Sequence, residues 1–306
     1  MKLIIATRRS ALALWQAEHV KSLLEQTHAG LTVELLPVVT EGDRIQDRPL
    51  SEVGGKGLFI KELEVAMHEG RAHLAVHSMK DVPWNMPAGF TLAAFLPRAD
   101  PRDAFVANRY PTLESLPEGA CVGTSSQRRQ CLLRAARPDL AITLLRGNVD
   151  TRLRKLDAGD YDAIVLAAAG LGRLGLGGRI TATLAPERFV PAVGQGAIGI
   201  ECRTDPEVQA LLAPLNDAHT EICLRAERAF AAALGAGCTS PIAAHATLRD
   251  GALSLAAMIG SATSGELVHG SATGEAGMAE AIGGQLAHEL LGRGGRALLQ
   301  SATHPH

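Results

Sequence analysis

The sequence predicts an α/β protein with two domains of mostly parallel sheet covered by helices, followed by a small C-terminal α+β domain. Strand-like and helix-like segments alternate over about the first two-thirds of the chain, as they do where helical crossovers join parallel strands. The 306 residues are enough for about two or three domains with separate cores. After about residue 218 the alternation gives way to short strands and turns, which indicates a domain of a different kind.

The first series of elements starts with a strand at 2–7 and a helix at 10–26. Ser10 stands where its hydroxyl would cap the first turn of that helix. Four side chains recur at helical spacing and predict one face of it, namely Leu12, Trp15, His19 and Leu23. The alternation continues with a strand at 32–39, a helix at 58–70, and strands at 74–78 and 91–96.

A joint rich in proline and charge, PRADPRD at 97–103, separates this series from a second one. The second series has strands at 103–107, 120–125, 142–147 and 163–168, and helices at 126–136 and 149–159. Another joint lies near 187–199. The last part has a helix at 220–233, strand-like segments at 245–251, 252–260 and 265–274, and a helix at 278–291.

Composition and charge argue against several classes of protein. The net charge of −2 and the 46% of hydrophobic residues are ordinary for a globular chain. Aromatic residues make up only 3%, which argues against single-stranded nucleic acid held by stacking. The longest apolar run, at 163–171, is too short for a membrane span, and the N-terminal LIIA is too short for a signal-peptide core. We therefore expect a soluble cytoplasmic protein.

The five cysteines include no Cys-x-x-Cys pair. We therefore expect neither a disulfide framework nor a zinc site, and free thiols suit the reducing cytosol. Cys238 lies in a run of small residues, LGAGCTSPI, directly after a helix. A lone thiol is most often a small buried hydrophobe, but this loop is a poor place for core packing. The thiol is either a nucleophile or an attachment point, and attachment is favoured because no histidine partner is evident nearby in the sequence.

Two glycine-rich stretches have ordinary alternatives. GQGAIG (194–199) matches the dinucleotide-binding pattern, but the following IGIEC alternates like a strand instead of opening a helix. We therefore interpret it as a crossover between domains. VGGKGLF (53–59) is either an anion cradle before a helix or a surface loop.

Polar residues cluster where strands are expected to end. HSMKDVP places Lys80 and Asp81 just after a strand, where ligands bind in open α/β sheets; the alternative is a solvated turn with a surface ion pair. GTSSQRRQ (123–130) and RGNVDTR (146–152) each link a strand to a helix with hydroxyls or arginines, as anion sites do. Residues 128–179 carry ten Arg or Lys and five Asp or Glu, a balance that suits a small polyanion in a cleft better than a long duplex.

Taken together and in this order, the motifs resemble the porphobilinogen deaminase (hydroxymethylbilane synthase) family. They are ATRRSALALWQ, VGGKGLF with IKELE, AVHSMKDVP, DPRDAFV, GTSSQRRQ, LRGNVDTRL, AAAGLGRLG, PAVGQGAIGIECR and GAGCTSPI. The resemblance implies a transferase of tetrapyrrole (haem) biosynthesis that joins four porphobilinogen molecules head to tail with release of ammonia. It also implies a covalent dipyrromethane cofactor as primer, hydrolytic release of hydroxymethylbilane, and a monomer.

The resemblance implies a fold and a set of site residues. The first two domains would be like type II periplasmic binding proteins, and the expected domains are 1–98 with 196–216, 99–195, and 217–306. Cys238 would carry the cofactor through a thioether, and Asp81 would be the catalytic carboxylate. Further cofactor-binding residues would be Lys80, Asp81 (in addition to its catalytic role), Thr124, Ser126, Arg128, Arg129 and Arg146. Substrate and the growing polypyrrole chain would meet Arg8, Ser10, Arg146, Arg152, Arg173 and Gln195, under a lid that includes Lys56, Gly57 and Phe59.

Two positions depart from the family pattern, because Ala236 replaces a common glycine before Gly237 and Glu52 stands where some relatives have a basic residue. The main alternative function is a non-enzymatic anion-binding protein with the periplasmic architecture. It leaves Cys238, Asp81 and the missing signal peptide unexplained. A nucleic-acid binder is a more distant alternative. Two pyrrole units in the intact mass of the purified protein would exclude both alternatives.

Overall fold

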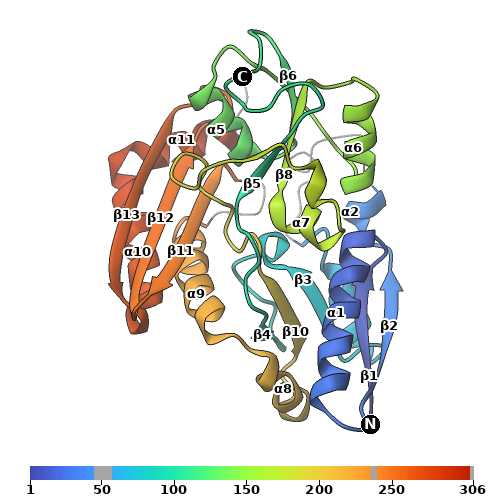
Figure 1. Cartoon of the computed structure of the whole chain (residues 1–306). Coiled ribbons are helices and arrows are strands. Elements are labelled where there is room, and N and C mark those ends of the chain that lie inside the picture. Colours follow the sequence, from blue (N-terminus) through green and yellow to red (C-terminus); the bar gives the residue numbers. More distant parts are fainter. Residues whose placement is uncertain (45–56, 236–239, 304–306) are drawn as a thin grey trace.

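The computed structural model describes residues 1–44, 57–235 and 240–303, so the predicted roles of Lys56 and Cys238 lie outside the described residues. Three sheets organise the described part of the chain (Figure 1). Two have five strands and one has three. This arrangement confirms the prediction of two α/β units followed by a small α+β unit.

The first sheet has the strand order β2-β1-β3-β10-β4. Its strands are β1 (Lys2–Arg8), β2 (Thr32–Val38), β3 (Leu74–Ser78), β4 (Phe90–Phe95) and β10 (Ile198–Arg203). β1 runs parallel to β2 and β3, whereas β10 runs antiparallel to both β3 and β4. A segment close to residue 200 therefore completes a sheet that is otherwise built from the first 95 residues.

The second sheet repeats this plan with the order β7-β6-β8-β5-β9. Its strands are β5 (Asp103–Val106), β6 (Cys121–Gly123), β7 (Ala141–Thr143), β8 (Ala163–Ala167) and β9 (Ala182–Thr183). β5 is the antiparallel strand here, in the place that β10 has in the first sheet. Each sheet thus receives its antiparallel strand from a segment that has just crossed from the other one.

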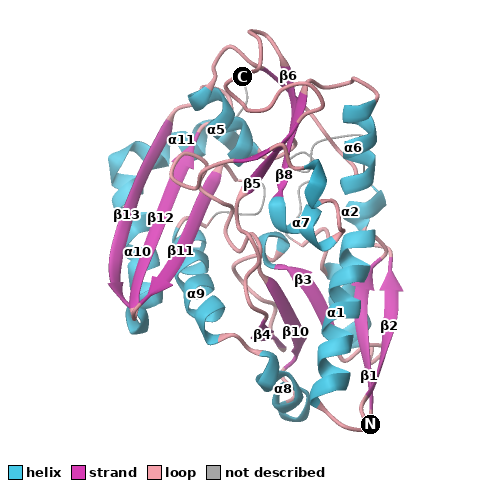
Figure 2. Cartoon of the chain, viewed as in Figure 1, coloured by secondary structure: helices cyan, strands magenta, loops and turns pink. Residues whose placement is uncertain are grey.

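Helices cover the faces of both large sheets (Figure 2). The α-helices are α1 (Ala11–Thr27), α2 (Glu41–Arg44), α4 (Lys61–His68), α5 (Gln127–Ala136), α6 (Val149–Asp157), α7 (Ala168–Arg173) and α8 (Pro206–Leu212). Short 3-10 helices are η1 (Met79–Asp81), η2 (Gly177–Arg179) and η3 (Ala213–Leu215). α2, α7 and α8 were not predicted. The glycines of α7 and the shortness of all three helices leave no clear apolar period in the sequence.

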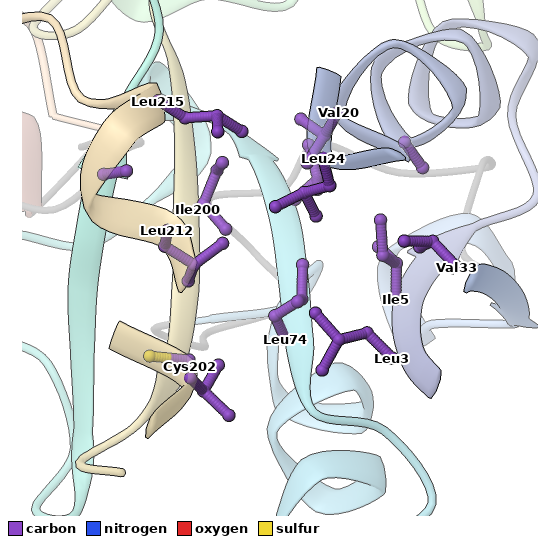
Figure 3. Close-up of a cluster of buried hydrophobic side chains, with 14 of the residues drawn as sticks. Leu3, Ile5, Val20, Leu24, Val33, Leu74, Ile200, Cys202, Leu212 and Leu215 are labelled. Atoms are coloured by element: carbon purple, nitrogen blue, oxygen red, sulfur yellow. The ribbon is translucent and has the colours of Figure 1, made fainter. Parts of the chain in front are cut away.

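The largest hydrophobic cluster of the first unit lies between the β2-β1-β3-β10-β4 sheet and helices α1 and α8 (Figure 3). α1 contributes Ala17, Val20 and Leu24, which pack against strand residues such as Leu3 and Leu74. The predicted face of α1 divides between two surroundings: Leu23 packs against this cluster, whereas Trp15 is 37% exposed. Leu12, at the start of the helix, lies next to Gly170 of α7 in the second unit.

The C-terminal sheet consists of β11 (Ile242–Arg249), β12 (Ala252–Gly260) and β13 (Leu267–Glu275). α9 (Ala218–Ala233) and α10 (Ala279–Leu290) share a hydrophobic core with it. From the same sheet, Ala243 and Met258 join the core of the second unit. The remaining elements are η4 (Ala276–Met278), η5 (Leu291–Gly295) and α11 (Arg296–Thr303).

Among the described helices, none has both the length and the apolar character that crossing a bilayer requires.

Candidate active site

The catalytic candidates of the first unit lie at the carboxyl ends of two neighbouring parallel strands. β1 ends at Arg8 and β3 ends at Ser78. Lys80 and Asp81 follow Ser78 directly in η1, and Gln16 of α1 donates to the Ser78 hydroxyl over 2.9 Å. Strand pairing therefore places these polar residues at one edge of the sheet, as the sequence predicted.

The second unit presents its polar residues in the same way. β6 leads through Thr124 to α5, whose N-cap is Ser126, and β7 leads to Arg146 and then α6. The Ser126 hydroxyl accepts a hydrogen bond from the backbone N–H of Arg129 and so caps α5. β8 leads to α7, where Arg173 is the last residue. Arg152 lies on α6.

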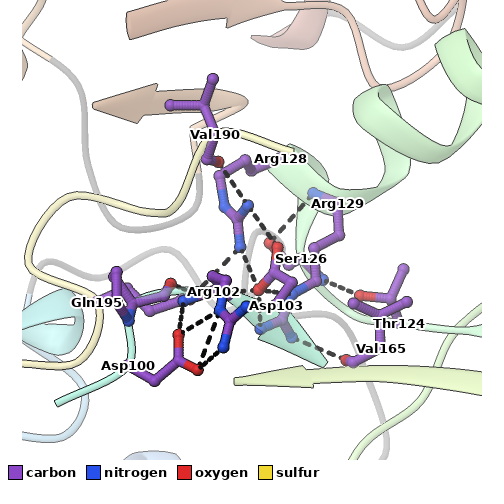
Figure 4. Close-up of polar contacts among 11 residues, drawn as sticks. Asp100, Arg102, Asp103, Thr124, Ser126, Arg128, Arg129, Val165, Val190 and Gln195 are labelled. Atoms are coloured by element: carbon purple, nitrogen blue, oxygen red, sulfur yellow. Dashed lines mark hydrogen bonds and ion pairs between the residues drawn. The ribbon is translucent and has the colours of Figure 1, made fainter. Parts of the chain in front are cut away.

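Arg128 and Arg129 converge on one buried carboxylate, that of Asp103 (Figure 4). Arg128 Nη1 and Nη2 donate to its two oxygens at 2.8 and 3.0 Å. Arg129 Nε and Nη2 donate to Oδ1 at 3.1 and 2.8 Å. Burial would raise the pKa of Asp103, but the two guanidinium groups outweigh it and hold this pKa far below its usual value. DPRDAFV contains Asp103, yet the sequence predicted no role for it.

Gln195 lies behind this arginine pair and is only 1% exposed. Its amide Nε2 donates to the Pro101 carbonyl at 2.6 Å and to Asp103 Oδ1 at 3.0 Å. Residues 97–103 are the first crossover between the two large sheets, and residues 187–199 are the second. The Gln195 side chain thus joins the second crossover to the first. Its predicted contact with substrate remains a prediction, and the contacts described for it are structural.

Lys80 faces charges from both units. Burial, Arg129 and Arg152 together lower its pKa to about 8, against the opposing effects of Asp81 and Asp103. Burial, Arg129 and Arg146 also lower the pKa of Arg152 to about 10, against the opposing effect of Asp81. These electrostatic effects indicate that Lys80 and Asp81 of the first unit lie close to Arg129 and Arg152 of the second.

Arg146 and Arg173 complete the cationic wall. Arg146 is 8% exposed, and burial lowers its pKa. Burial likewise lowers the pKa of Arg173 to about 10, and its Nη2 donates to the Gly196 carbonyl at 2.7 Å. Arg173 therefore binds the crossover that leads to β10.

Ser10 caps a helix, and Arg8 forms an ion pair within the first unit. The Ser10 hydroxyl accepts from the backbone N–H of Ala13 at 3.4 Å, which confirms the predicted cap of α1. The Arg8 guanidinium forms an ion pair with Asp43 of α2 and lies over the Phe59 ring, 4.1 Å from its centroid. Gly57 and Phe59, two predicted lid residues, belong to the turn before α4.

A cavity of about 50 Å³ joins this site to the C-terminal unit. Its walls include Lys80 and Trp84 from the first unit, Val193 from the crossover, and Arg228 and Ser240 from the segments on either side of residues 236–239. The described flanks of the Cys238 loop therefore lie against Lys80.

The charges of this site fit a ligand with several carboxylates. Lys80, Arg146, Arg152 and Arg173 are cations whose pKa values are lowered by burial. Among the described side chains, the buried Nε of Arg128 also has no hydrogen-bond partner. A bound polyanion would stabilise this excess of positive charge.

Two residues that the sequence analysis missed hold the crossovers together. Arg98 donates from Nη1 and Nη2 to the carboxylate of Glu227 on α9 at 2.5 and 3.1 Å. Glu227 is fully buried and also accepts from the backbone N–H groups of Gly194 and Ala246 at 2.7 and 2.8 Å. A buried charge pair between distant segments has no local sequence signal.

Comparison with solved structures finds periplasmic binding proteins. The methionine-binding protein MetQ is 15% identical, covers 70% of this chain and 89% of its own, and has a TM-score of 0.44. A periplasmic substrate-binding protein of an ABC transporter from Coxiella burnetii is 14% identical, with coverages of 70% and 91% and a TM-score of 0.45. The aliphatic sulphonate binding protein SsuA from Escherichia coli is 14% identical, with coverages of 76% and 70% and a TM-score of 0.40.

Two family models match most of the chain. Residues 3–210 match the model described as "Porphobilinogen deaminase, dipyromethane cofactor binding domain", and residues 221–292 match "Porphobilinogen deaminase, C-terminal domain". The first match alone spans more than half of the 306 residues. The chain therefore belongs to the porphobilinogen deaminase family, the transferases that make hydroxymethylbilane for tetrapyrrole biosynthesis with a dipyrromethane cofactor.

Proposed function

We propose that this chain condenses porphobilinogen between the Lys80–Asp81 turn of the first unit and the arginine-bearing edge of the second. The observation that carries this proposal is that charges of both units act on the same groups: Asp81, Arg129 and Arg152 affect the pKa of Lys80, and Asp81 and Arg129 affect the pKa of Arg152. Each porphobilinogen brings an acetate and a propionate, so every added unit requires cations. Arg146, Arg152, Arg173, Arg8 and Ser10 would hold carboxylates of the substrate and the growing chain.

Asp81 would act on the reacting substrate. When ammonia leaves porphobilinogen, the pyrrole becomes electron-poor, and a fixed carboxylate next to it lowers the free energy of the developing positive charge. Asp81 is half-buried in η1, where its charge is less screened than in bulk water. It would also accept hydrogen bonds from pyrrole N–H groups.

Cys238 would hold the dipyrromethane through a thioether. When bound, the group supplies the free pyrrole carbon to which the first substrate is joined. Lys80, Thr124, Ser126 and Arg146 would bind its carboxylates, together with Arg128 and Arg129, whose guanidinium groups are at the same time paired with Asp103. The cavity lined by Lys80 and Ser240 supports this assignment, because Ser240 and Arg228 flank the Cys238 loop in the chain and share this cavity with Lys80, one of the predicted carboxylate ligands.

The three sheets support three domains with boundaries near those expected: 1–98 with 196–216, 99–195, and 217–306. The assignment of 196–216 to the first domain is supported by β10, which pairs with β3 and β4. A cytoplasmic location is supported by the four described cysteines, all of which are free thiols. The proposed monomeric state is testable by sedimentation of the holoprotein.

The decisive experiment compares the intact mass of the purified wild type with that of Cys238→Ala. We expect the wild type to carry two pyrrole units and Cys238→Ala to fold without them and without turnover, because its primer has no attachment point. Cys202→Ala is the matched control and should keep the added mass. Two pyrrole units on Cys121, Cys131, Cys202 or Cys223 in place of Cys238 would show that the assignment is wrong.

A further inference from the structure

Two residues, Asp43 and Phe59, hold the Arg8 guanidinium from different directions. Neither the sequence motifs nor the family match assigns them a role in orienting Arg8. Its Nε donates to both carboxylate oxygens of Asp43 at 3.2 Å, and its Nη2 also donates to Oδ1. Phe59 covers one face of the guanidinium at 4.1 Å. The ion pair is largely withdrawn from solvent, since both side chains are only 23% exposed.

Asp43 is itself fixed in place. The hydroxyl of Thr40 donates to Asp43 Oδ2 at 2.8 Å, and the backbone N–H of Thr40 is 3.4 Å from the same oxygen. Burial would raise the pKa of Asp43, but Arg8 and Thr40 outweigh it and lower this pKa. The carboxylate therefore stays charged at neutral pH.

Phe59 is held against the same short helix. The backbone N–H of Gly42 in α2 donates to the Leu58 carbonyl at 3.0 Å. A Cβ on Gly42 would lie 2.2 Å from Cε1 of Phe59, so the ring packs where only glycine leaves room. α2 and the turn at 57–60 thus form one support for the guanidinium.

The contacts leave one edge of Arg8 available. A guanidinium has two edges that bind a carboxylate in a bidentate manner, one through Nε and Nη2 and one through Nη1 and Nη2. Asp43 occupies the first edge. Among the described residues, Nη1 has no hydrogen-bond partner, so the second edge remains for another carboxylate.

We propose that Asp43 is a positioning residue that, together with Phe59, aims the free edge of Arg8 at a carboxylate of porphobilinogen or the growing chain. This inference rests on the proposed function of Arg8. Because an arginine fork loses rotamer freedom when it binds, an arginine that is already oriented binds a carboxylate more tightly. Asp43 also offsets the charge of Arg8 before substrate arrives.

The test measures kcat and KM for porphobilinogen in holoprotein variants with equal cofactor content by intact mass. Asp43→Ala should raise KM roughly tenfold and change kcat less than about threefold, because it removes binding that is common to ground and transition states. Asp43→Asn, which keeps the shape, should raise KM in the same direction. Gly42→Ala should also raise KM, since its methyl group displaces the Phe59 ring. Glu41→Ala, at an exposed position in the same helix, is the matched control and should leave KM unchanged.

A double-mutant cycle separates positioning from general stability. In an Arg8→Lys background, Asp43→Ala should have little further effect on KM, because a lysine ammonium has no fork to orient. Three results would each overturn the proposal. Asp43→Ala could change KM equally in both backgrounds, or it could leave KM unchanged. It could also lower KM, which would mark Asp43 as a competitor of substrate. If Arg8→Leu raises KM but Asp43→Ala does not, only the positioning role fails. If Arg8→Leu leaves KM unchanged, the substrate-binding role of Arg8 fails as well.

Discussion

Asp81 and Lys80 are adjacent in a three-residue 3-10 helix, yet their surroundings give them different tasks. Asp81 opposes the lowering of the Lys80 pKa by burial and by Arg129 and Arg152. A carboxylate next to several cations is a fixed negative charge in a site that otherwise attracts anions. This combination suits a reaction in which the substrates are polyanions and the developing charge is positive.

Removing the charge of Asp81 should therefore lower turnover more than binding. One charge at about 4 Å and an effective dielectric near 20 contributes roughly 4 kcal/mol, which corresponds to about three powers of ten in rate. Asp81→Asn should show a loss of kcat of that order and keep its cofactor, whereas Asp81→Glu should retain more activity and accumulate partly elongated chains. Turnover and intact mass after addition of porphobilinogen check this. Near-normal turnover of Asp81→Asn would assign the chemistry to another group.

The lowered pKa of Lys80 predicts a pH dependence for cofactor assembly on the apo-protein. Below about pH 8 the ammonium is charged and binds carboxylates, and above about pH 8 it becomes neutral. The assembly rate should therefore fall as the pH rises through about 8. In Lys80→Arg the charge persists, so the falling limb should move to higher pH. Holoprotein formation by intact mass across pH 6 to 10 (roughly the window around this pKa) is the measurement. An unmoved limb in Lys80→Arg would mean that another group titrates.

At the scale of elements, the position of η1 depends on how closely the second crossover approaches it. The backbone N–H of Met79 donates to the Ala197 carbonyl at 3.0 Å. Gly194 has a positive φ of +72°, and a Cβ there would lie 2.7 Å from Met79 Cβ and 3.1 Å from the backbone nitrogen of Lys80. The glycine-rich joint thus supports the turn that carries Lys80 and Asp81, and β10 follows it in place of the helix of a dinucleotide site.

Gly194→Ala should consequently harm both stability and activity. Left-handed backbone costs an alanine about 1–2 kcal/mol, and overlap with Met79 adds to this cost. Gly30→Ala is the matched control, because Gly30 has a similar φ of +77° but no atom within 4 Å of the added Cβ. We expect both variants to lower Tm, and only Gly194→Ala to lower kcat as well. Equal effects of the two variants on Tm and kcat would show that the close approach has no consequence.

At the scale of the whole molecule, Glu227 links three parts of the chain. It accepts hydrogen bonds from Arg98 in the first crossover, Gly194 in the second and Ala246 in the C-terminal sheet. Burial would raise its pKa, but Arg98 and His245 outweigh this and lower it to about 2. The helix that carries Glu227 is also the one that leads to the Cys238 loop.

Glu227→Gln should strongly destabilise the fold, because it leaves Arg98 as a buried charge without its counterion. Breaking a buried pair costs about 3–5 kcal/mol, so Tm should fall by on the order of 10 °C. Glu280→Gln removes the exposed partner of Arg225 and should change Tm by only about a degree or two. The lowered pKa means that the contribution of Glu227 is present above about pH 4.5 and is lost as the pH falls toward 2. Thermal unfolding at pH 7 and pH 3 tests this: the Tm values of Glu227→Gln and Glu280→Gln should differ less at pH 3 than at pH 7.

The sequence by itself determined the local structure and the chemical class of the site. Periodicity predicted most strands and long helices, and Ser10 could be identified as a cap, because these features depend on contacts a few residues apart. The order of the motifs also identified the family, and it predicts the roles of Cys238 and Asp81. These features are encoded in neighbouring residues and require no knowledge of the path of the chain.

Only the tertiary structure decided which distant groups meet. Arg128 and Arg129 looked like two open anion-binding forks, but Asp103, 25 residues before Arg128, already binds both. Leu12 of α1 lies next to Gly170 of α7 in the other unit, a contact that helical spacing does not reveal. Arg98 and Glu227 are 129 residues apart. Such pairs form because burial forces each charge to find an opposite charge, and which charges are buried together depends on how the two crossovers route the chain.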